Sequence, residues 1–102
     1  MTSYQLTIVS PHGKIFDDKI EALTAPGVEG EVGVLGGHVP MVNALKPGVV
    51  KITKEGQEKY FAIASGILEV NKVHQVLLLT NDAQSVSNRD EARERSAILE
   101  KK

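Results

Sequence analysis

The residues with the most distinctive chemistry lie in the glycine-rich segment 27–40, where Glu29 and Glu31 alternate with glycines and His38 follows. A glycine-rich turn is one way to bind phosphate, but this segment matches neither G-x-G-x-x-G nor G-x-x-x-x-G-K-[ST]. The two carboxylates would also repel a phosphate. Frequent glycine instead indicates a backbone that turns sharply and approaches another surface closely. The segment is interpreted either as an irregular hairpin between strands or as an interaction loop.

The histidines, which are His12, His38 and His74, are candidate metal ligands. No two of them have the i, i+4 spacing of a helical zinc site, and the chain has no cysteine, so carboxylates would have to complete any site. We read the three as unrelated and predict no metal. His38 is framed by glycines and Pro40, which makes it the histidine of most interest.

Catalytic residue patterns are also lacking. Ser65 lies in Ala64-Ser65-Gly66, which is not a G-x-S-x-G elbow. Asp17 and Asp18 are adjacent in a predicted strand and therefore point to opposite faces, so they do not form an acid–base pair. We predict neither an enzyme nor a bound cofactor.

Composition narrows the class of partner. The 102-residue chain has a net charge of −1 and dispersed lysines, which gives no general attraction to nucleic acid or anionic lipid. Without cysteine there is no disulfide framework. The first twenty residues are not those of a signal peptide, and no apolar run approaches the ~20 residues of a membrane span. We expect a soluble chain that reaches a membrane only through partners.

The elements that must position these residues read as short strands. Apolar residues alternate with polar ones around Leu6 and Ile8, and again in 49–54, where Val50 and Ile52 share one face. Glu55-Gly56 predicts a tight hairpin. Residues 76–79 are all apolar, so this strand is apolar on both faces and is predicted to lie in the middle of a packed sheet. Many short strands favour a β-sandwich or barrel; the further strands are expected at 14–24, 58–65, 67–70 and 73–79.

The C-terminal region has a different composition. Residues 80–87 read as a polar connection, and a charged helix follows from Asn88, with Ser87 as its cap and Asp90 in the capping-box position. Such a helix is marginal alone in water, so it is expected to fray or to dock. We divide the chain into a β-domain, 1–85, and a helical segment, 86–102. The apolar stripe expected on the helix is Ala92, Ile98 and Leu99.

Residues 29–42, EGEVGVLGGHVPMV, closely resemble the E-G-E-[LV]-G-[IV]-x-x-G-H-x-P-[LM]-[LV] stretch of the ε family of ATP synthases. Residues 45–48 (LKPG) and 65–71 (SGILEVN) look like the same family, and 90–93 (DEAR) resemble the start of its C-terminal helix. The match runs in order from Tyr4 to about Arg95. A long motif with two more at the right separations is specific.

This resemblance implies a mainly β fold, a ten-stranded β-sandwich followed by a short α-helix. It implies a non-catalytic rotor subunit of the central stalk that binds the γ subunit and the c-ring and helps couple ion flow to ATP synthesis. Contact with the α and β subunits would involve the C-terminal segment. The implied location is peripheral, on the cytoplasmic face of a bacterial inner membrane, or on the stromal face of the thylakoid in a plastid.

Site residues carried over from the resemblance fall into two sets. The c-ring contact is expected at Glu29, Gly30 and Glu31, whose carboxylates would meet the polar loops of the c subunits. The γ contact is expected at His38, Val39, Met41 and Val42.

The chain departs from the family at its C-terminus. Most bacterial members continue into two antiparallel helices, whereas this sequence stops at Lys102. Asp90 and Arg93 fit the ATP-binding motif [IL]-D-x-x-R-A of some members, but Arg89 and Glu94 replace its aliphatic residue and alanine. With the second helix also missing, we predict no useful ATP affinity. The alternative function, a free-standing β-sandwich that binds a small ligand, is weakened because the chain has only four aromatic residues.

Overall fold

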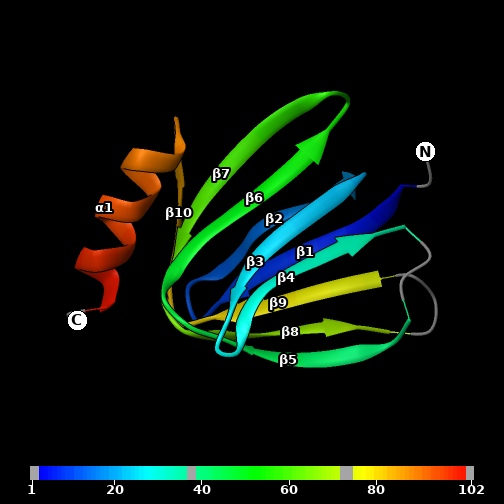
Figure 1. The fold of residues 1–102 in the computed structure, drawn as a ribbon, viewed down its shortest axis with the longest axis horizontal. Helices are drawn as coiled ribbons and strands as arrows, with labels where there is room; N and C mark the ends of the chain where they lie inside the picture. The colour runs from blue at the N-terminus through cyan, green and yellow to red at the C-terminus, as the bar shows by residue number, and fades with distance from the viewer. Residues whose placement is uncertain (1–2, 37–38, 72–74, 101–102) are drawn as a thin grey trace.

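The computed structural model describes residues 3–36, 39–71 and 75–100, and in them ten β-strands precede one α-helix (Figure 1). The mainly β class and the ten-stranded sandwich are therefore confirmed. The elements are β1 Tyr4–Ser10, β2 Gly13–Ile20, β3 Ala22–Gly27, β4 Gly30–Leu35, β5 Met41–Leu45, β6 Gly48–Lys54, β7 Gln57–Ile63, β8 Gly66–Val70, β9 Gln75–Thr80, β10 Ala83–Val86 and α1 Arg89–Glu100.

The strands form two layers that join at one corner. One layer, the helix-side sheet, has the order β10-β7-β6-β3-β4, and the other, the open sheet, has the order β5-β8-β9-β1-β2. They connect where the end of β3 passes from β6 to β5, at the pair Gly27 and Leu45. The pair β1–β9 is parallel and the other recorded pairs are antiparallel.

Alternate residues of each strand fill the space between the layers, as a period of two requires. In β1 the inward side chains are Tyr4, Leu6 and Ile8, and in β6 they are Val50 and Ile52. The hydroxyl of Tyr4 donates to the backbone oxygen of Val34 at 2.7 Å, which satisfies a buried polar group, and burial raises the pKa of Tyr4. The core is otherwise aliphatic.

Contacts between β2 and β6 nearly close the sandwich on its second side. The rings of Phe16 and Phe61 meet edge to face, with centroids 5.8 Å apart. Lys54 forms an ion pair with Asp18 beside them. The hydrogen bond from Lys54 lowers the pKa of Asp18 and, conversely, the pKa of Lys54 is raised.

The hairpin predicted at Glu55-Gly56 is confirmed. Both residues have positive φ, 52° and 77°, as a type I′ turn requires. Strand β7, which follows this turn, packs on both of its faces. Its inward residues, Phe61 and Ile63, belong to the main core. Ala62, and Ala64 just beyond the strand, face outward toward α1.

Helix α1 is docked on the outer face of the helix-side sheet, over β7, β6 and β10 (Figure 1). Its buried residues are Ala92, Ser96 and Leu99, which follow the spacing i, i+4, i+7. The expectation that Ile98 belongs to this stripe is wrong, since its side chain is 57% exposed. A polar residue, Ser96, is buried in the stripe instead. Its hydroxyl donates to the backbone oxygen of Ile63 at 3.2 Å.

Two strand predictions are wrong. Residues 14–24 form two strands, because the chain leaves the open sheet and enters the helix-side sheet at Glu21, whose N–H donates to the oxygen of Thr53 at 2.8 Å. Residues 80–87 are not merely a connection, since they contain β10, which pairs with β7. Only Ala83 of this short strand points into the core, so its alternation was too weak to read.

The expected helix cap is displaced by one residue. The side-chain oxygen of Asn88, not of Ser87, accepts the N–H of Glu91 at 2.8 Å, and the backbone oxygen of Asn88 accepts the N–H of Ala92 at 3.0 Å. Asn88 is therefore the N-cap and Glu91 occupies the third helical position. Serine and asparagine both cap helices well, so the sequence alone does not decide which of the two neighbouring residues is the cap.

The prediction that the run 76–79 lies in the middle of a sheet is confirmed, since β9 lies between β8 and β1. Val76 and Leu78 are buried in the core, but Leu77 is only half-buried and Leu79 is 43% exposed. The outer face of the open sheet therefore has an apolar part that no described element covers.

Candidate partner-binding surface

Residues 27–35 of the glycine-rich segment belong to a hairpin that is regular rather than irregular. Strands β3 and β4 pair from Ala22–Leu35 to Gly27–Gly30, with Val28 and Glu29 as the turn. Gly30 has φ of 131°, a conformation that side chains rarely adopt. A Cβ at Gly27 would lie 2.4 Å from the oxygen of Gly30, so only glycine allows this approach. The geometry of the hairpin therefore favours glycine at both positions, 27 and 30.

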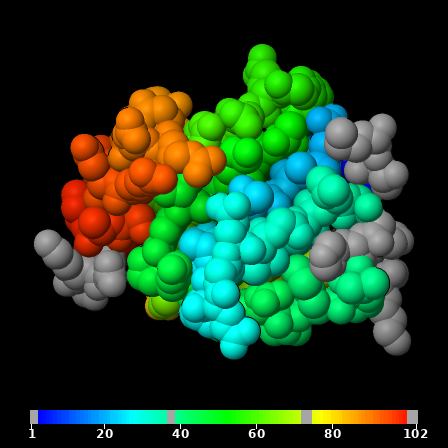
Figure 2. Space-filling view, viewed as in Figure 1, coloured from blue at the N-terminus to red at the C-terminus, as the bar shows by residue number. Residues whose placement is uncertain are grey.

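The hairpin tip is held against β5 by two backbone hydrogen bonds. The N–H of Val28 donates to the oxygen of Ala44 at 3.0 Å, and the N–H of Lys46 donates to the oxygen of Pro26 at 2.9 Å. Figure 2 shows the tip, in cyan, projecting beside β5. The tip therefore presents its side chains from a fixed backbone.

Glu29 and Glu31 are both exposed on this hairpin, and no ion pair to either is found in the part of the chain that the structure describes. Residues 27–32 and 42–44 line a shallow depression of about 450 Å³. The structure thus brings the predicted c-ring residues Glu29, Gly30 and Glu31 next to Val42, which was assigned to the other set.

The predicted γ-contact residues do not form a single cluster. Val39 and Val42 are exposed, at 69% and 68%. Met41 is half-buried and packs against the core, because alternate residues of β5 point inward. His38 lies outside the described residues. Val39 and Val42 are therefore available to a partner, whereas Met41 supports the strand from inside.

The sequence analysis missed a larger apolar surface. Strand register aligns Ala44, Ile67, Leu79 and Val9 across four neighbouring strands of the open sheet, and we call this set the apolar row. Ile67 and Leu79 are 46% and 43% exposed. The unbroken apolar run 76–79 was the available signal, but it was interpreted only as the middle of a packed sheet.

Close backbone packing shapes one end of the apolar row. A Cβ at Gly66 would lie 2.2 Å from the oxygen of Leu79, so glycine is needed where β8 and β9 meet. A groove of about 520 Å³ opens there, lined by the exposed side chains of Ile67 and Leu79 together with residues 9–11 and 80–81.

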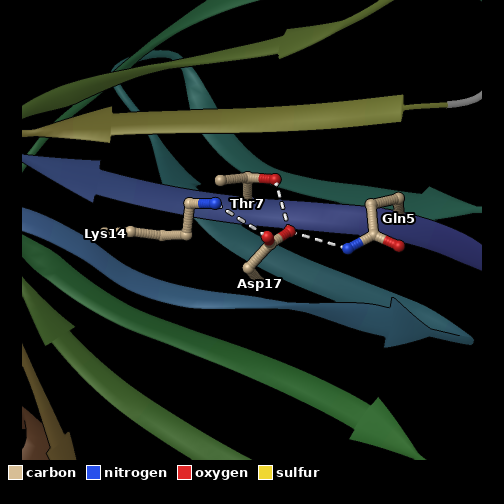
Figure 3. Close-up of polar contacts among 4 residues, drawn as sticks. All are labelled: Gln5, Thr7, Lys14 and Asp17. Atoms are coloured by element: carbon tan, nitrogen blue, oxygen red, sulfur yellow. Dashed lines mark hydrogen bonds and ion pairs between the residues drawn. The ribbon is translucent and has the colours of Figure 1, made fainter.

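A polar network bounds the apolar row toward β2. The carboxylate of Asp17 accepts hydrogen bonds from Lys14 at 3.0 Å, Gln5 at 2.7 Å and Thr7 at 3.0 Å (Figure 3). The hydrogen bond from Lys14, followed by those from Gln5 and Thr7, lowers the pKa of Asp17. These polar groups satisfy one another.

The remaining candidate residues lie apart from this surface. Asp90 and Arg93 are exposed on α1. Among the described residues, no group of three or more histidines and carboxylates is placed to hold a metal ion. The helix in the described region is also too short and too polar to cross a bilayer. The hairpin and the apolar row together present carboxylates, apolar side chains and backbone groups, which are suited to binding another protein.

Comparison with known proteins gives consistent results. The family model of the ATP synthase delta/epsilon chain β-sandwich domain matches residues 3–86. The ATP synthase epsilon chain of Psychrobacter cryohalolentis is 36% identical over 94 residues, which cover 91% of this chain and 67% of the relative.

Two solved structures share the fold. A chain of the Euglena gracilis mitochondrial ATP synthase, from a structure containing OSCP, F1 and the c-ring, has a TM-score of 0.79 and 27% identity over 89% of this chain. This chain spans 59% of the length of that one. A chain of the Tetrahymena thermophila central stalk and c-ring has a TM-score of 0.69, 15% identity and coverage of 96% and 92%, which shows the fold alone. The resemblance read from the sequence is confirmed, and the chain belongs to the family of ATP synthase delta/epsilon chains.

Proposed function

We propose that this chain is a non-catalytic rotor subunit of the central stalk of an F-type ATP synthase. It binds the γ subunit and the c-ring and helps couple transmembrane ion flow to ATP synthesis. The observation that carries the proposal is the family match over residues 3–86, supported by 36% identity to an epsilon chain.

The c-ring contact is assigned to Glu29, Gly30 and Glu31. The two carboxylates project from a hairpin that is fixed to β5 by backbone hydrogen bonds, so they are presented without a large loss of conformational freedom on binding. The polar loops of the c subunits are suitable partners for exposed carboxylates. In support, the Euglena relative comes from a structure that includes a c-ring.

The γ contact is assigned to Val39, Val42 and the apolar row, with Met41 behind them and His38 in the adjoining segment. Contiguous exposed apolar surface of this kind marks protein interaction sites in soluble proteins. Val42 lies on β5, beside both the hairpin and the row, so the two contacts are neighbours on one surface.

The cellular location and the division of labour follow from these contacts. The subunit is peripheral, held at the cytoplasmic face of a bacterial inner membrane, or at the stromal face of a thylakoid, through its partners. We assign residues 1–85 to binding of the stalk and ring, and the segment 86–102, which contains α1, to contact with the α and β subunits. No useful ATP affinity is expected, since Asp90 and Arg93 lack the rest of the family's ATP motif.

The test is gel filtration of the chain mixed with the γ subunit of the same organism. A one-to-one complex at micromolar concentration is expected. Two separate peaks under these conditions would contradict the stalk assignment.

Glu31→Lys tests the c-ring contact separately. Charge reversal on the hairpin should weaken binding to detergent-solubilised c-ring by about tenfold or more, as loss of a complementary charged contact does. Glu94→Lys, an exposed charge reversal on α1, is the matched control and should bind normally. Equal binding by both variants would remove Glu31 from the interface.

A further inference from the structure

Two carboxylates project from the outer face of the open sheet, and their surroundings differ. Strand register places them in one line across five strands, which runs Val42, Glu69, Leu77, Thr7 and Asp17. Asp17 accepts hydrogen bonds from three neighbouring side chains and forms an ion pair with one of them. Glu69 is exposed, and the described part of the chain provides no ion pair for it.

The neighbours of Glu69 are apolar. Val42 on β5 and Leu77 on β9 lie directly opposite it, and the Cβ atoms of such cross-strand pairs are about 5 Å apart. Ile67, two residues earlier on β8, lies on the same face and belongs to the apolar row. Val42 and Ile67 are themselves well exposed. Glu69 is therefore a charged side chain set among exposed apolar ones.

A protein that covers the apolar row also covers Glu69, because Ile67 and Glu69 are only about 7 Å apart along the strand. Removing a carboxylate from water is strongly unfavourable unless a cation or hydrogen-bond donors replace the water. The apolar contact would then be opposed by the desolvation of Glu69. A partner that binds this face must therefore bring a positively charged group to Glu69.

The described chain does not supply that group itself. All of its arginines lie between residues 89 and 95, on the helix that covers the opposite sheet. On the open sheet, Lys14 is paired with Asp17, and Lys19 lies on β2, with β9 and β1 between it and the strand of Glu69. A second copy packed about a two-fold axis near Glu69 would oppose two carboxylates, which is unfavourable. The cation is therefore expected from a different protein.

Arginine fits this position better than lysine. Its guanidinium group is planar and weakly hydrated and can donate two parallel hydrogen bonds to one carboxylate. Its aliphatic stem can lie along apolar side chains such as Val42 and Leu77. A depression of about 670 Å³ opens beside Glu69, lined also by Leu77, Thr7 and Gln75, and leaves room for the guanidinium group.

We propose that Glu69 pairs with an arginine of the protein that covers the apolar row, and that this pair decides which partner the surface accepts. The matching surface of the partner is apolar and carries one arginine. This inference rests on the proposed function, which assigns the apolar row and Val42, the cross-strand neighbour of Glu69, to an intermolecular contact.

Glu69→Gln and Glu69→Met remove the charge and nearly keep the length of the side chain. Both variants should fold with nearly unchanged stability, because residue 69 is exposed. Affinity for γ, the partner assigned to this surface above, should fall by about tenfold or more in each, since the arginine is left unpaired. Methionine gives the sharper test, because it adds apolar surface and would bind equally or more tightly if no arginine faced it. Glu94→Gln on α1 is the matched control and should bind normally.

A charge exchange then identifies the arginine. Glu69→Arg should abolish measurable binding, and changing the contacting arginine of γ to glutamate should restore the affinity to within about tenfold of wild type. Isothermal titration calorimetry measures each combination. Loss of binding that no arginine of γ rescues would rule out the pair.

The remaining outcomes separate this inference from the proposed function. A γ complex whose affinity is unchanged in Glu69→Gln and Glu69→Met would overturn the pair and leave the proposed function intact. Absence of any γ complex would overturn both. Self-association of the free chain, abolished by Ile67→Asp, would assign the surface to a second copy and overturn the proposal.

Discussion

Both outer faces of this sandwich carry apolar side chains, but the two faces differ in whether an element of the chain covers those side chains. On the helix-side sheet, Ala62 and Ala64 point outward and are buried at 0% and 7% exposure, because α1 lies over them. On the open sheet, Ile67 and Leu79 point outward and remain nearly half exposed. One apolar face is covered by the chain's own helix, and the other is left bare.

The difference is one of side-chain size as well as cover. The small side chains of Ala62 on β7 and of Ala64 just beyond it allow a helix to approach closely, and Ala92 packs against them with no exposed surface. The larger residues of the apolar row protrude and suit the uneven surface of another protein. Within one chain, the same strand alternation thus produces an internal packing face and an intermolecular one.

The comparison is tested most strongly by the same substitution on each face. Ala62→Asp would bury a carboxylate under α1 and should destabilise the fold by about 3 kcal/mol, because an unpaired charge cannot be accommodated there. Ala44→Asp places the same group on the bare face and should change the unfolding free energy by less than about 0.5 kcal/mol. Chemical denaturation measures both values, and far-UV circular dichroism reports on α1. Equal effects would mean that the helix does not cover its face in solution.

A second pair of variants tests what the bare face is for. Ile67→Asp should lower the affinity for γ by about tenfold or more, because it puts a charge in the middle of the apolar row. Ile98→Asp is the matched control, since Ile98 is similarly exposed but lies on α1. Both should fold with nearly unchanged stability. Titration of each variant with γ decides the matter, and equal affinities would rule out the row as the interface.

A smaller effect is expected where the covering helix begins. Asn88→Ala removes the cap that accepts the N–H of Glu91 and should cost about 1 kcal/mol. Ser87→Ala removes a hydroxyl that does not cap the helix and should cost less than about 0.3 kcal/mol. Thermal unfolding compares the two. A larger loss for Ser87→Ala would place the start of the helix one residue earlier.

The same positions show how far the sequence alone leads. Alternation in 49–54 and the Glu55-Gly56 turn predict local structure correctly, because each depends only on neighbouring residues. The break at Glu21 and the four-residue β10 escape prediction, since both depend on which sheet the chain joins. Ser96 was missed for the same reason: a buried serine is recognisable only once the oxygen of Ile63 is seen beside it.

The candidate surface is likewise only partly readable. Glycines and carboxylates in 27–31 indicate a close backbone approach and an acidic tip, and their geometry agrees with this. The apolar row could not be found, because its members come from four strands and meet only through register. Its exposed large side chains, Ile67 and Leu79, cannot be distinguished in the sequence from buried strand residues. Whether a face is covered depends on the whole fold, and no element of the described residues lies over this one.

The smallest expected effect concerns the polar margin of the bare face. The pKa of Asp17 is lowered in the folded chain, so its contribution to stability is present above the unfolded pKa of about 3.9 and is lost as pH falls through the lower folded value. Asp17→Asn should therefore flatten the loss of stability below about pH 4. Lys14→Met, which removes the strongest cause of the shift, should flatten it in part. Acid unfolding followed by circular dichroism measures the three profiles. Because Asp17 is exposed, the differences will be small, and superimposable profiles would show that this network does not help to hold β1 and β2 together at the edge of the apolar row.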